Sequence, residues 1–223
     1  MDFMTLLQDS FPSLLSGLLV TLKITIFSLI FASIIGLLVG LLNISSNKIL
    51  KRIAVIYIDI MRGTPLIVLA FFIYFGIPSV LDGIRFEAVT AGIIALSLNA
   101  GAYMAEIFRA GILSVHKGQM EAARSLGLSY GKAMRKVILP QAIRTMIPSI
   151  INQFIISLKD TSILSVIGLR ELTQSGQIII ASSFKSFQIW LIVGVMYFIV
   201  ITAISIIAKR IERRLSYEYS QRA

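Results

Sequence analysis

The sequence lacks cysteine altogether and contains one histidine among its 223 residues. Without cysteine the chain has no disulfide framework and no thiolate-ligated zinc or iron–sulfur site. The single histidine, His116, cannot form a histidine cluster, so we predict no metal site. Charged residues are scarce as well, because 14% of the chain is charged and 57% is hydrophobic. A soluble domain has about a quarter of its residues charged, so these shortages predict a membrane protein.

Acidic residues are the scarcer of the two charge types. The chain has 11 Asp and Glu residues against 21 Lys and Arg residues, which gives a formal net charge of +10. In a soluble protein this excess would suggest a nucleic-acid partner. In a chain this apolar it is typical of basic loops on the cytoplasmic side of a membrane. We therefore predict contact with membrane lipid and no nucleic-acid partner.

Long apolar runs divide the chain into five segments, each long enough to cross a bilayer as a helix of about 20 residues. We predict an all-α, polytopic membrane protein with one transmembrane domain, residues 1–223. Gly36 and Gly40 predict close helix packing in the first span. The predicted spans cover residues 14–42, 57–80, 87–108, 142–167 and 186–208.

The chain shows no internal repeat, which argues against a single-chain carrier built from inverted halves. Five helices alone also make a poor complete pathway. The economical prediction is a dimer, with the route along the shared interface.

Basic residues in the predicted loops define an orientation. Fifteen Lys and Arg residues lie after the first span, around the loop between the third and fourth spans, and in the C-terminal tail. The opposite side has three, Arg85, Arg170 and Lys185. We therefore predict an N-terminus outside the membrane and a cytoplasmic C-terminus.

The cytoplasmic loop of residues 117–140 has the pattern of a helix, a tight turn and a second helix. Gly127 suits the left-handed position that ends the first helix, and Ser129 suits the N-cap of the second. Apolar and basic residues of the second helix fall on opposite sides. We expect Pro140 to limit this helix.

Part of the same loop looks faintly like a nucleotide-binding P-loop. A P-loop needs four residues between its glycines and Ser or Thr after its lysine. Here three residues separate Gly127 from Gly131, and Ala133 follows Lys132. We predict that the chain itself binds no ATP and no other cofactor, so that energy comes from a partner or an ion gradient.

Polar residues inside the third and fourth spans are the candidates for a substrate site. Such residues usually face a partner or an aqueous cavity, because they are costly in lipid. Helical spacing places them on neighbouring stripes, and Glu106 extends the stripe of the third span. A zwitterionic amino acid needs a donor for its carboxylate and an acceptor for its ammonium. The predicted substrate residues are Asn99, Tyr103, Asn152, Gln153, Lys159 and Asp160.

Structural roles compete with these assignments. Lys159 and Asp160 alternatively pair with each other at the outer end of the fourth span. The three amide side chains of the predicted site alternatively form hydrogen bonds between helices. Glu106 and Arg109 are three residues apart, a spacing that suits a salt bridge.

The second span opens with Arg62, Gly63, Thr64 and Pro65, in which Gly and Pro together predict a bent or unwound entry. Thr64 suits the cap of a helix that begins at Pro65. Asp59 is one turn away and has the charge to neutralise Arg62. A gating or hinge role is one interpretation of these four residues, and simple packing is the alternative.

Residues 121–140 resemble the EAA loop of ABC importer permeases. The family pattern is EAA, three residues, Gly, nine residues and Ile-x-Leu-Pro, and the chain departs from it in having Val137 for Ile. The resemblance implies that this loop docks into a groove on a separate cytoplasmic ATPase. The residues that match are Glu121, Ala122, Ala123, Gly127, Leu139 and Pro140.

Further stretches resemble the polar amino acid branch of ABC permeases, the histidine, glutamine and arginine permease family, with glutamine permeases most similar. These stretches are residues 60–66, 99–109, 116–119, 152–153, 157–162, 166–168, 171–173 and 212–214. The resemblance implies a type I ABC importer permease in the cell membrane of a prokaryote. It also implies a second permease subunit, identical or related, and two ATPases that bind ATP and Mg²⁺. An extracytoplasmic binding protein would deliver a polar L-amino acid.

The resemblance bears on the substrate as well. Family members for cationic amino acids often carry Glu where this chain has Gln153, and a neutral Gln153 offers no counter-charge to arginine or lysine. The hypothesis is an ATP-driven importer subunit for polar amino acids, with glutamine favoured, that performs no covalent chemistry itself. The alternative is an ion-gradient-driven amino acid transporter with Asp160 or Glu106 as a proton relay.

Overall fold

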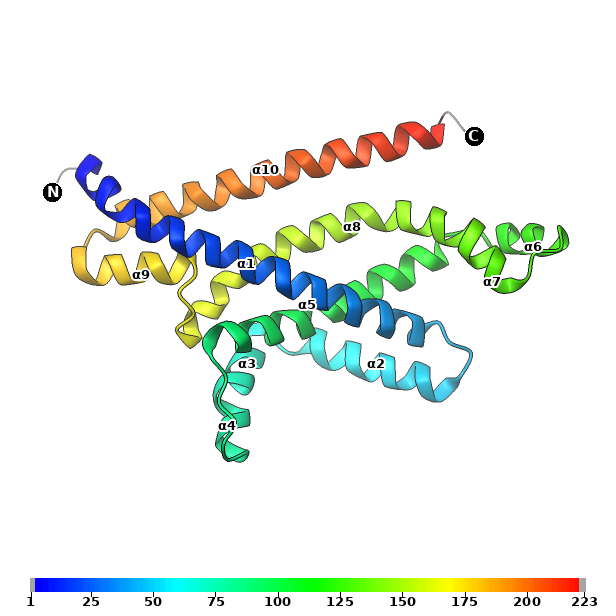
Figure 1. Ribbon diagram of the computed structural model, residues 1–223, viewed down its shortest axis with the longest axis horizontal. Helices are drawn as coiled ribbons and strands as arrows, with labels where there is room; N and C mark the ends of the chain where they lie inside the picture. Colours follow the sequence, from blue (N-terminus) through cyan, green and yellow to red (C-terminus); the bar gives the residue numbers. More distant parts are fainter. Residues whose placement is uncertain (1–2, 221–223) are drawn as a thin grey trace.

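The structure is a computed structural model that describes residues 3–220, with side chains described for residues 3–211. It is helical, without a strand in that range, and its long helices run broadly along one axis (Figure 1). The α-helices are α1 (Phe3–Asn43), α2 (Lys48–Gly63), α3 (Leu66–Phe71), α4 (Ile77–Val80), α5 (Ala88–Leu113), α6 (Lys117–Ser125), α7 (Tyr130–Ala133), α8 (Leu139–Asp160), α9 (Leu172–Ser183) and α10 (Ser186–Ser220). Two π-helical turns, η1 (Phe72–Gly76) and η2 (Met134–Ile138), and a 3₁₀ helix, η3 (Thr161–Ile167), adjoin them.

Among the described residues, four helical stretches are long and apolar enough to cross a membrane. They are Phe3–Asn43, Ala88–Leu113, Tyr130–Ile167 and Ser186–Ile211. The pair Lys48–Gly63 and Leu66–Val80 meets the same criteria together, although its two halves are bent by 100°. The predicted all-α, polytopic membrane fold is confirmed, with four candidate spans, or five if the bent pair is one span.

The bend occurs at the Gly63-Thr64-Pro65 sequence that predicts it. Thr64 has an extended backbone (φ −99°, ψ 124°), and its N–H donates to the Ile60 carbonyl at 3.0 Å. A residue before proline is disfavoured in the helical region, so α2 ends there. Pro65, not Thr64, is the N-cap residue of α3. The expectation that Thr64 caps the following helix is therefore wrong.

Small residues bring α1 and α5 into close contact. A Cβ added at Gly36 would lie 3.0 Å from the backbone nitrogen of Ala105, and one added at Gly40 would lie 3.0 Å from its carbonyl oxygen. Neither position has room for a side chain unless α5 moves. The close packing predicted from these two glycines is confirmed.

Glu171 anchors a helix that the apolar runs do not reveal. Its Oε1 accepts a hydrogen bond from the Gln174 N–H at 2.7 Å, which caps α9. Its Oε2 accepts from the Tyr197 hydroxyl of α10 at 2.8 Å. The Leu172 N–H donates to the Thr21 hydroxyl of α1 at 3.2 Å. These bonds tie α9 to the first and last long helices.

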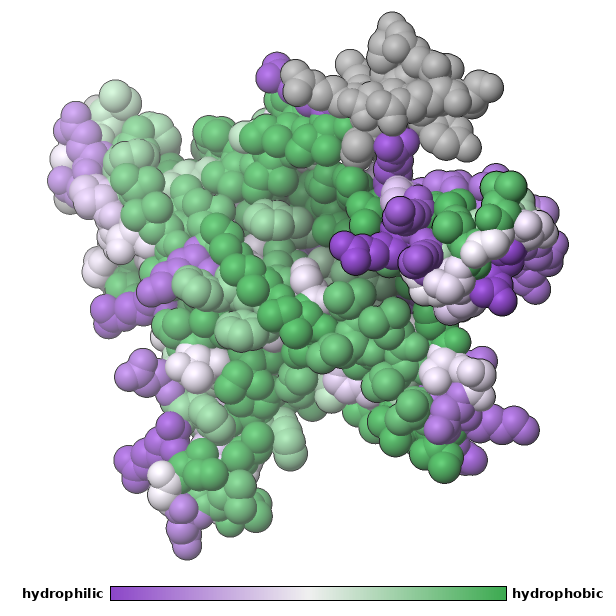
Figure 2. All heavy atoms as spheres, turned by 45° about the vertical axis from the view of Figure 1, so that its right-hand side comes forward, coloured by the Kyte–Doolittle hydropathy of each residue, from purple (hydrophilic) through white to green (hydrophobic). Residues whose placement is uncertain are grey.

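The surface has the distribution expected for a protein surrounded by lipid. Apolar side chains form a broad belt, and hydrophilic side chains gather toward the two ends (Figure 2). The start of α1, α9 and the start of α10 lie at one end, and α6, α7, the α1–α2 turn and the last turns of α10 lie at the other (Figure 1). The long axis of the molecule therefore runs across the membrane.

Candidate functional site

A cavity of about 760 Å³ lies between α5 and α8 and is called the α5–α8 cavity below. Its size suits a small-molecule ligand. Each of the two helices contributes residues at helical spacing, so one face of each forms a wall. The lining consists of Arg62 from α2, Tyr103, Glu106, Ile107, Ala110, Gly111 and Ser114 from α5, and Thr145, Met146, Pro148, Ser149, Asn152, Gln153 and Ile156 from α8.

The lining of the α5–α8 cavity includes one cationic side chain, Arg62, and one anionic side chain, Glu106. The Arg62 guanidinium carbon lies 5.2 Å from the centre of the Tyr103 ring, which is a cation–π contact. Arg62 forms no salt bridge with Asp59 among the described residues, so the predicted neutralisation is absent. Glu106 supplies the negative charge of the wall. The cavity therefore offers groups complementary to both ends of a zwitterion.

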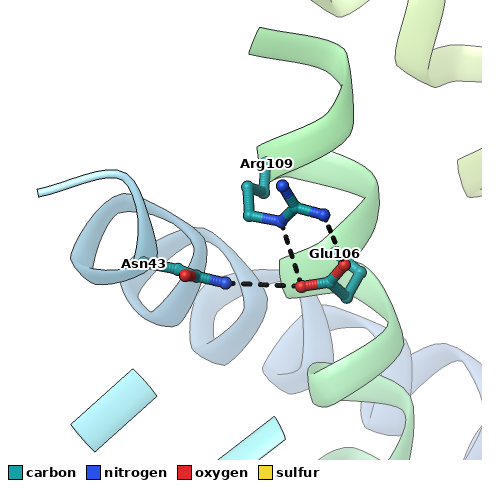
Figure 3. A network of polar contacts seen from close by, with 3 residues as sticks. All are labelled: Asn43, Glu106 and Arg109. Carbon is teal, nitrogen blue, oxygen red and sulfur yellow. Dashed lines mark hydrogen bonds and ion pairs between the residues drawn. The ribbon is translucent and has the colours of Figure 1, made fainter. Parts of the chain in front are cut away.

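Glu106 is held in place by two neighbours (Figure 3). Arg109 donates from Nε and Nη2 to the Glu106 carboxylate at 3.1 and 2.8 Å. Asn43, at the end of α1, donates from Nδ2 at 3.3 Å. The salt bridge predicted from the spacing of Glu106 and Arg109 is confirmed. This network joins the end of α1 to α5 and leaves the carboxylate on the cavity wall.

Amide and hydroxyl groups of α8 form another part of the wall. Gln153 is 5% exposed and donates to the Ser157 hydroxyl at 3.3 Å. Asn152 is exposed beside it, and Ser149 lies one turn earlier on the same wall. Such groups can donate to and accept from an uncharged polar side chain.

The structure places the six predicted substrate residues in three different settings. Tyr103, Asn152 and Gln153 line the α5–α8 cavity. Asn99 is buried and donates to the Met61 carbonyl at 3.0 Å, which is the interhelical bond weighed as its alternative role. Lys159 and Asp160 lie at the end of α8, outside the cavity lining, and form no salt bridge with each other. Arg62 and Glu106 are thus the charged residues that line the same cavity as Asn152 and Gln153.

Residues 117–140, called the coupling segment below, form a helical hairpin that projects at one end of the molecule (Figure 1). The His116 Nδ1 accepts from the Gly118 N–H at 3.1 Å and caps α6, a role that the sequence did not indicate. Gly127 has φ +82°, and its N–H donates to the Arg124 carbonyl at 3.0 Å. The Leu128 N–H donates to the Ala123 carbonyl at 3.2 Å. Paired bonds of this kind end helices at a left-handed glycine, as predicted.

The second half of the hairpin does not end where the sequence suggested. α7, η2, α8 and η3 form one helical stretch from Tyr130 to Ile167, and Pro140 lies in the first turn of α8. The π-helical turn Met134–Ile138 precedes it, and the Leu139 N–H donates to the Met134 carbonyl, five residues back. This wider turn accommodates a residue that lacks an N–H inside a continuous helix. The expectation that Pro140 limits the helix is therefore wrong. Ser129 stands at the N-cap, but its side chain makes no capping bond.

The tip of the hairpin presents apolar side chains among basic ones. Leu126 is 85% exposed and Tyr130 is 61% exposed. Glu121 and Ala122 are exposed on α6, whereas Ala123 is buried against the rest of the hairpin. In Figure 2 the projecting lobe accordingly shows hydrophobic and hydrophilic surface side by side. This mixed surface suits a protein partner.

Long spans, a cavity between two of them and a projecting hairpin define a membrane transport subunit. Comparison with known proteins agrees. The family described as "Binding-protein-dependent transport system inner membrane component" matches residues 32–217. The chain belongs to this family.

Individual relatives cover most of the chain. The glutamine transport system permease protein GlnP of Escherichia coli (strain K12) is 46% identical over 167 residues, 75% of this chain and 76% of the relative. The arginine transport system permease protein ArtQ of Bacillus subtilis (strain 168) is 37% identical over 204 residues, 92% and 93% of the two chains. The crystal structure of an amino acid ABC transporter with histidines superposes with a TM-score of 0.90 at 41% identity, covering 96% of this chain and 99% of that one.

These findings establish the class of the protein. It is a permease subunit of an ABC importer for polar amino acids and has the type I importer permease fold. It is a transport component and not an enzyme. A permease of this class lies in the inner membrane and works with a separate ATPase and a substrate-binding protein.

Proposed function

We propose that the α5–α8 cavity forms part of the passage for an uncharged polar L-amino acid, with glutamine favoured. The observation that carries this proposal is the neutral amide wall of Asn152 and Gln153 opposite charged residues of both signs. A cationic side chain would be left without a counter-charge at Gln153. The similarity to a glutamine permease points to the same substrate, and the similarity to an arginine permease makes the cationic amino acids the relevant competitors.

The charges of the cavity wall suit the backbone groups of an amino acid. Arg62 has five N–H donors. Its side chain contacts the Tyr103 ring and interacts electrostatically with Glu106, but it forms no hydrogen bond or salt bridge among the described residues, so its donors are available for a carboxylate. Glu106 accepts three hydrogen bonds from Arg109 and Asn43. An ionised carboxylate offers about four acceptor positions, which leaves one for an ammonium group. In this proposal Arg62 and Glu106, instead of Lys159 and Asp160, hold the two ends of the zwitterion.

The coupling segment is the proposed docking element for the ATPase. The exposed tip residues Leu126 and Tyr130 would enter a groove on the partner, while Gly127 fixes the angle between the two helices. ATP and Mg²⁺ would bind that partner. The matched residues of the segment, described above by their resemblance, are Glu121, Ala122, Ala123, Gly127, Leu139 and Pro140.

Three further features belong to the same proposal. The basic end of the molecule, with the coupling segment, faces the cytoplasm, and the N-terminus lies outside. A second copy of the chain completes the passage, because one copy has at most five spans among its described residues. The bend at Arg62, Gly63, Thr64 and Pro65 acts as a hinge beside the cavity, because it carries Arg62 at the end of α2.

Extraction of the chain from its native membrane in mild detergent tests the assembly. We expect a stoichiometric subunit with a P-loop and a second permease chain to co-purify. Proteoliposomes made from that complex should take up labelled glutamine only with ATP inside and the binding protein outside. Uptake driven by a proton gradient without ATP, and abolished by a protonophore, would instead support the ion-gradient alternative.

A further inference from the structure

A second pocket, of about 380 Å³, lies between the end of α1, the first turns of α2 and the end of α5. It is called the α1–α2–α5 pocket below. Glu106 lines both this pocket and the α5–α8 cavity, and the two share no other described lining residue. The α1–α2 turn, whose residues help to line this pocket, lies at the same end of the molecule as the coupling segment (Figure 1). The proposed passage for the amino acid does not account for it.

The pocket has basic side chains with N–H donors that no described salt bridge engages. Lys51 and Arg109 both line it. Arg109 uses Nε and Nη2 for Glu106, so its Nη1 donors are not engaged by that salt bridge (Figure 3). The Lys51 ammonium has no salt bridge among the described residues. The Glu106 carboxylate already accepts from Arg109 and Asn43, so the remaining hydrogen-bonding capacity of the pocket favours an anion.

The other side of the pocket is apolar. Val55 lies one turn after Lys51 on α2, and Leu113, at the end of α5, is 61% exposed. A cationic recess that opens beside apolar side chains matches the two parts of a phospholipid. Inorganic phosphate would engage only the cationic part.

We propose that the α1–α2–α5 pocket binds a phosphate-bearing anionic group, supplied by the headgroup of an anionic phospholipid. Lys51 and Arg109 contact the phosphate, and an acyl chain lies along Val55 and Leu113. Basic pockets between membrane helices on the cytoplasmic side bind such headgroups. The bound lipid would brace the α1–α2 turn against α5, next to the residues that position Glu106. The proposal is independent of which amino acid the protein transports.

Lipid retention by the purified permease–ATPase complex tests the proposal. The complex is exchanged into detergent with equal amounts of phosphatidylglycerol and phosphatidylcholine, and bound lipid is counted by native mass spectrometry. We expect preferential retention of phosphatidylglycerol. Lys51→Gln should lower that retention about fivefold, the factor for one basic residue at an anionic lipid surface. Lys48→Gln removes the same charge from α2 at a residue that does not line the pocket, and should leave retention unchanged.

A second variant and a soluble competitor make the outcomes decisive. Val55→Glu adds a negative charge beside Lys51 and should abolish the preference for phosphatidylglycerol, with the ATPase still bound as a check on folding. Inorganic phosphate, tested without anionic lipid, distinguishes the sources: binding that weakens in Lys51→Gln would assign the site to soluble phosphate. Equal retention of the two lipids without phosphate binding, or equal losses in the Lys51 and Lys48 variants, would overturn the proposal.

Discussion

Gln153 decides the charge of the amide wall in the α5–α8 cavity. Gln153→Glu adds a nearly buried negative charge of similar shape. A charge-assisted hydrogen bond contributes about 1.5–3 kcal/mol, so we expect the affinity for arginine relative to glutamine to rise by at least about tenfold. Competition by arginine against labelled glutamine in the assembled transporter measures the change.

Gln141→Glu is the matched control for this substitution. Gln141 is also on α8, donates to the Val137 carbonyl at 2.9 Å and does not line the cavity. Gln141→Glu should not change the affinity for arginine relative to glutamine. An identical competition profile for the two variants would show that Gln153 does not contact the substrate.

Glu171 should make stability depend on pH. Burial raises the pKa of its carboxyl, and this effect outweighs the hydrogen bonds that it accepts. In the unfolded chain a glutamate titrates at about pH 4.3. The stability that Glu171 contributes is therefore full below that pH and is lost as the pH rises through the raised folded pKa. Glu171→Gln cannot ionise, so the melting temperature of the wild type relative to this variant should fall from about pH 4 to pH 7.

Glu87→Gln is the control for Glu171. Glu87 also precedes a helix, but it is exposed and makes no capping bond. Melting curves of this variant should follow the wild type across the same pH range. If the wild type and Glu171→Gln also ran parallel, the buried carboxyl would carry no pH-dependent stability.

At the scale of single residues, the sequence predicted which residues share one face of a helix. It did not predict what each face contacts. Spacing placed Tyr103 and Glu106 together on α5, and both line the cavity. Asn99 belongs to the same periodic pattern, yet its amide donates to Met61 on α2. Arg62 comes from a different helix, so no local pattern could join it to Tyr103.

At the scale of the element, Gly127 controls the shape of the coupling segment. A Cβ at this position would meet no atom within 4 Å, so the strain of Gly127→Ala comes from the positive φ alone. That strain costs about 1–2 kcal/mol. We expect an affinity for the ATPase at least about fivefold lower, measured by titration of the purified subunits.

Gly131→Ala provides the comparison within the same hairpin. Gly131 also has open space around it, but it lies inside α7 with an ordinary helical backbone. The affinity of this variant for the ATPase should stay the same or rise. A loss equal to that of Gly127→Ala would mean that the turn geometry is not what the ATPase recognises.

The contact between α1 and α5 predicts that a Gly→Ala substitution destabilises the protein there, although the same substitution stabilises it at an open position. Alanine in an open helical position is more stable than glycine by up to about 1 kcal/mol. Gly194→Ala, where nothing lies within 4 Å, should therefore raise the melting temperature. Gly40→Ala would place a Cβ 3.0 Å from the Ala105 carbonyl and 3.3 Å from the Phe108 Cβ, and should cost about 1–3 kcal/mol. Equal shifts in the two variants would contradict the packing described here.

Helix boundaries were the least predictable feature at this scale. Apolar runs locate the parts of a helix that contact lipid, but α2 begins at Lys48, in a basic stretch outside the apolar run of the predicted second span. α9 is too short to cross a membrane, and its signal is the capping Glu171. The continuous helix through Pro140 depends on a π-helical turn, which has no recognisable sequence pattern here.

At the scale of the whole molecule, the distribution of basic residues and the arrangement of the helices indicate the same axis across the membrane. The count of basic loop residues predicted one positive end, and the structure gathers the α1–α2 turn, the coupling segment and the last turns of α10 at one end. Surface hydropathy adds an apolar belt between the two ends (Figure 2). The all-α class and the four long candidate spans were predictable for this reason, because both follow from composition along the chain. The sequence indicated a local bend between α2 and α3. The angle of 100° depends on backbone geometry and could not be predicted from the sequence.

The absence of native cysteine allows the orientation to be tested directly, because one introduced cysteine is the only thiol. Ser46 is exposed in the α1–α2 turn, and Ser182 is exposed at the end of α9. Ser182→Cys should react with a membrane-impermeant maleimide on intact spheroplasts, whereas Ser46→Cys should react only after permeabilisation. Ser79→Cys, an exposed position within α4, should behave like Ser182→Cys. The reverse pattern would put the coupling segment outside the cell, beyond the reach of any cytoplasmic ATPase, and the proposed energy coupling would fail with it.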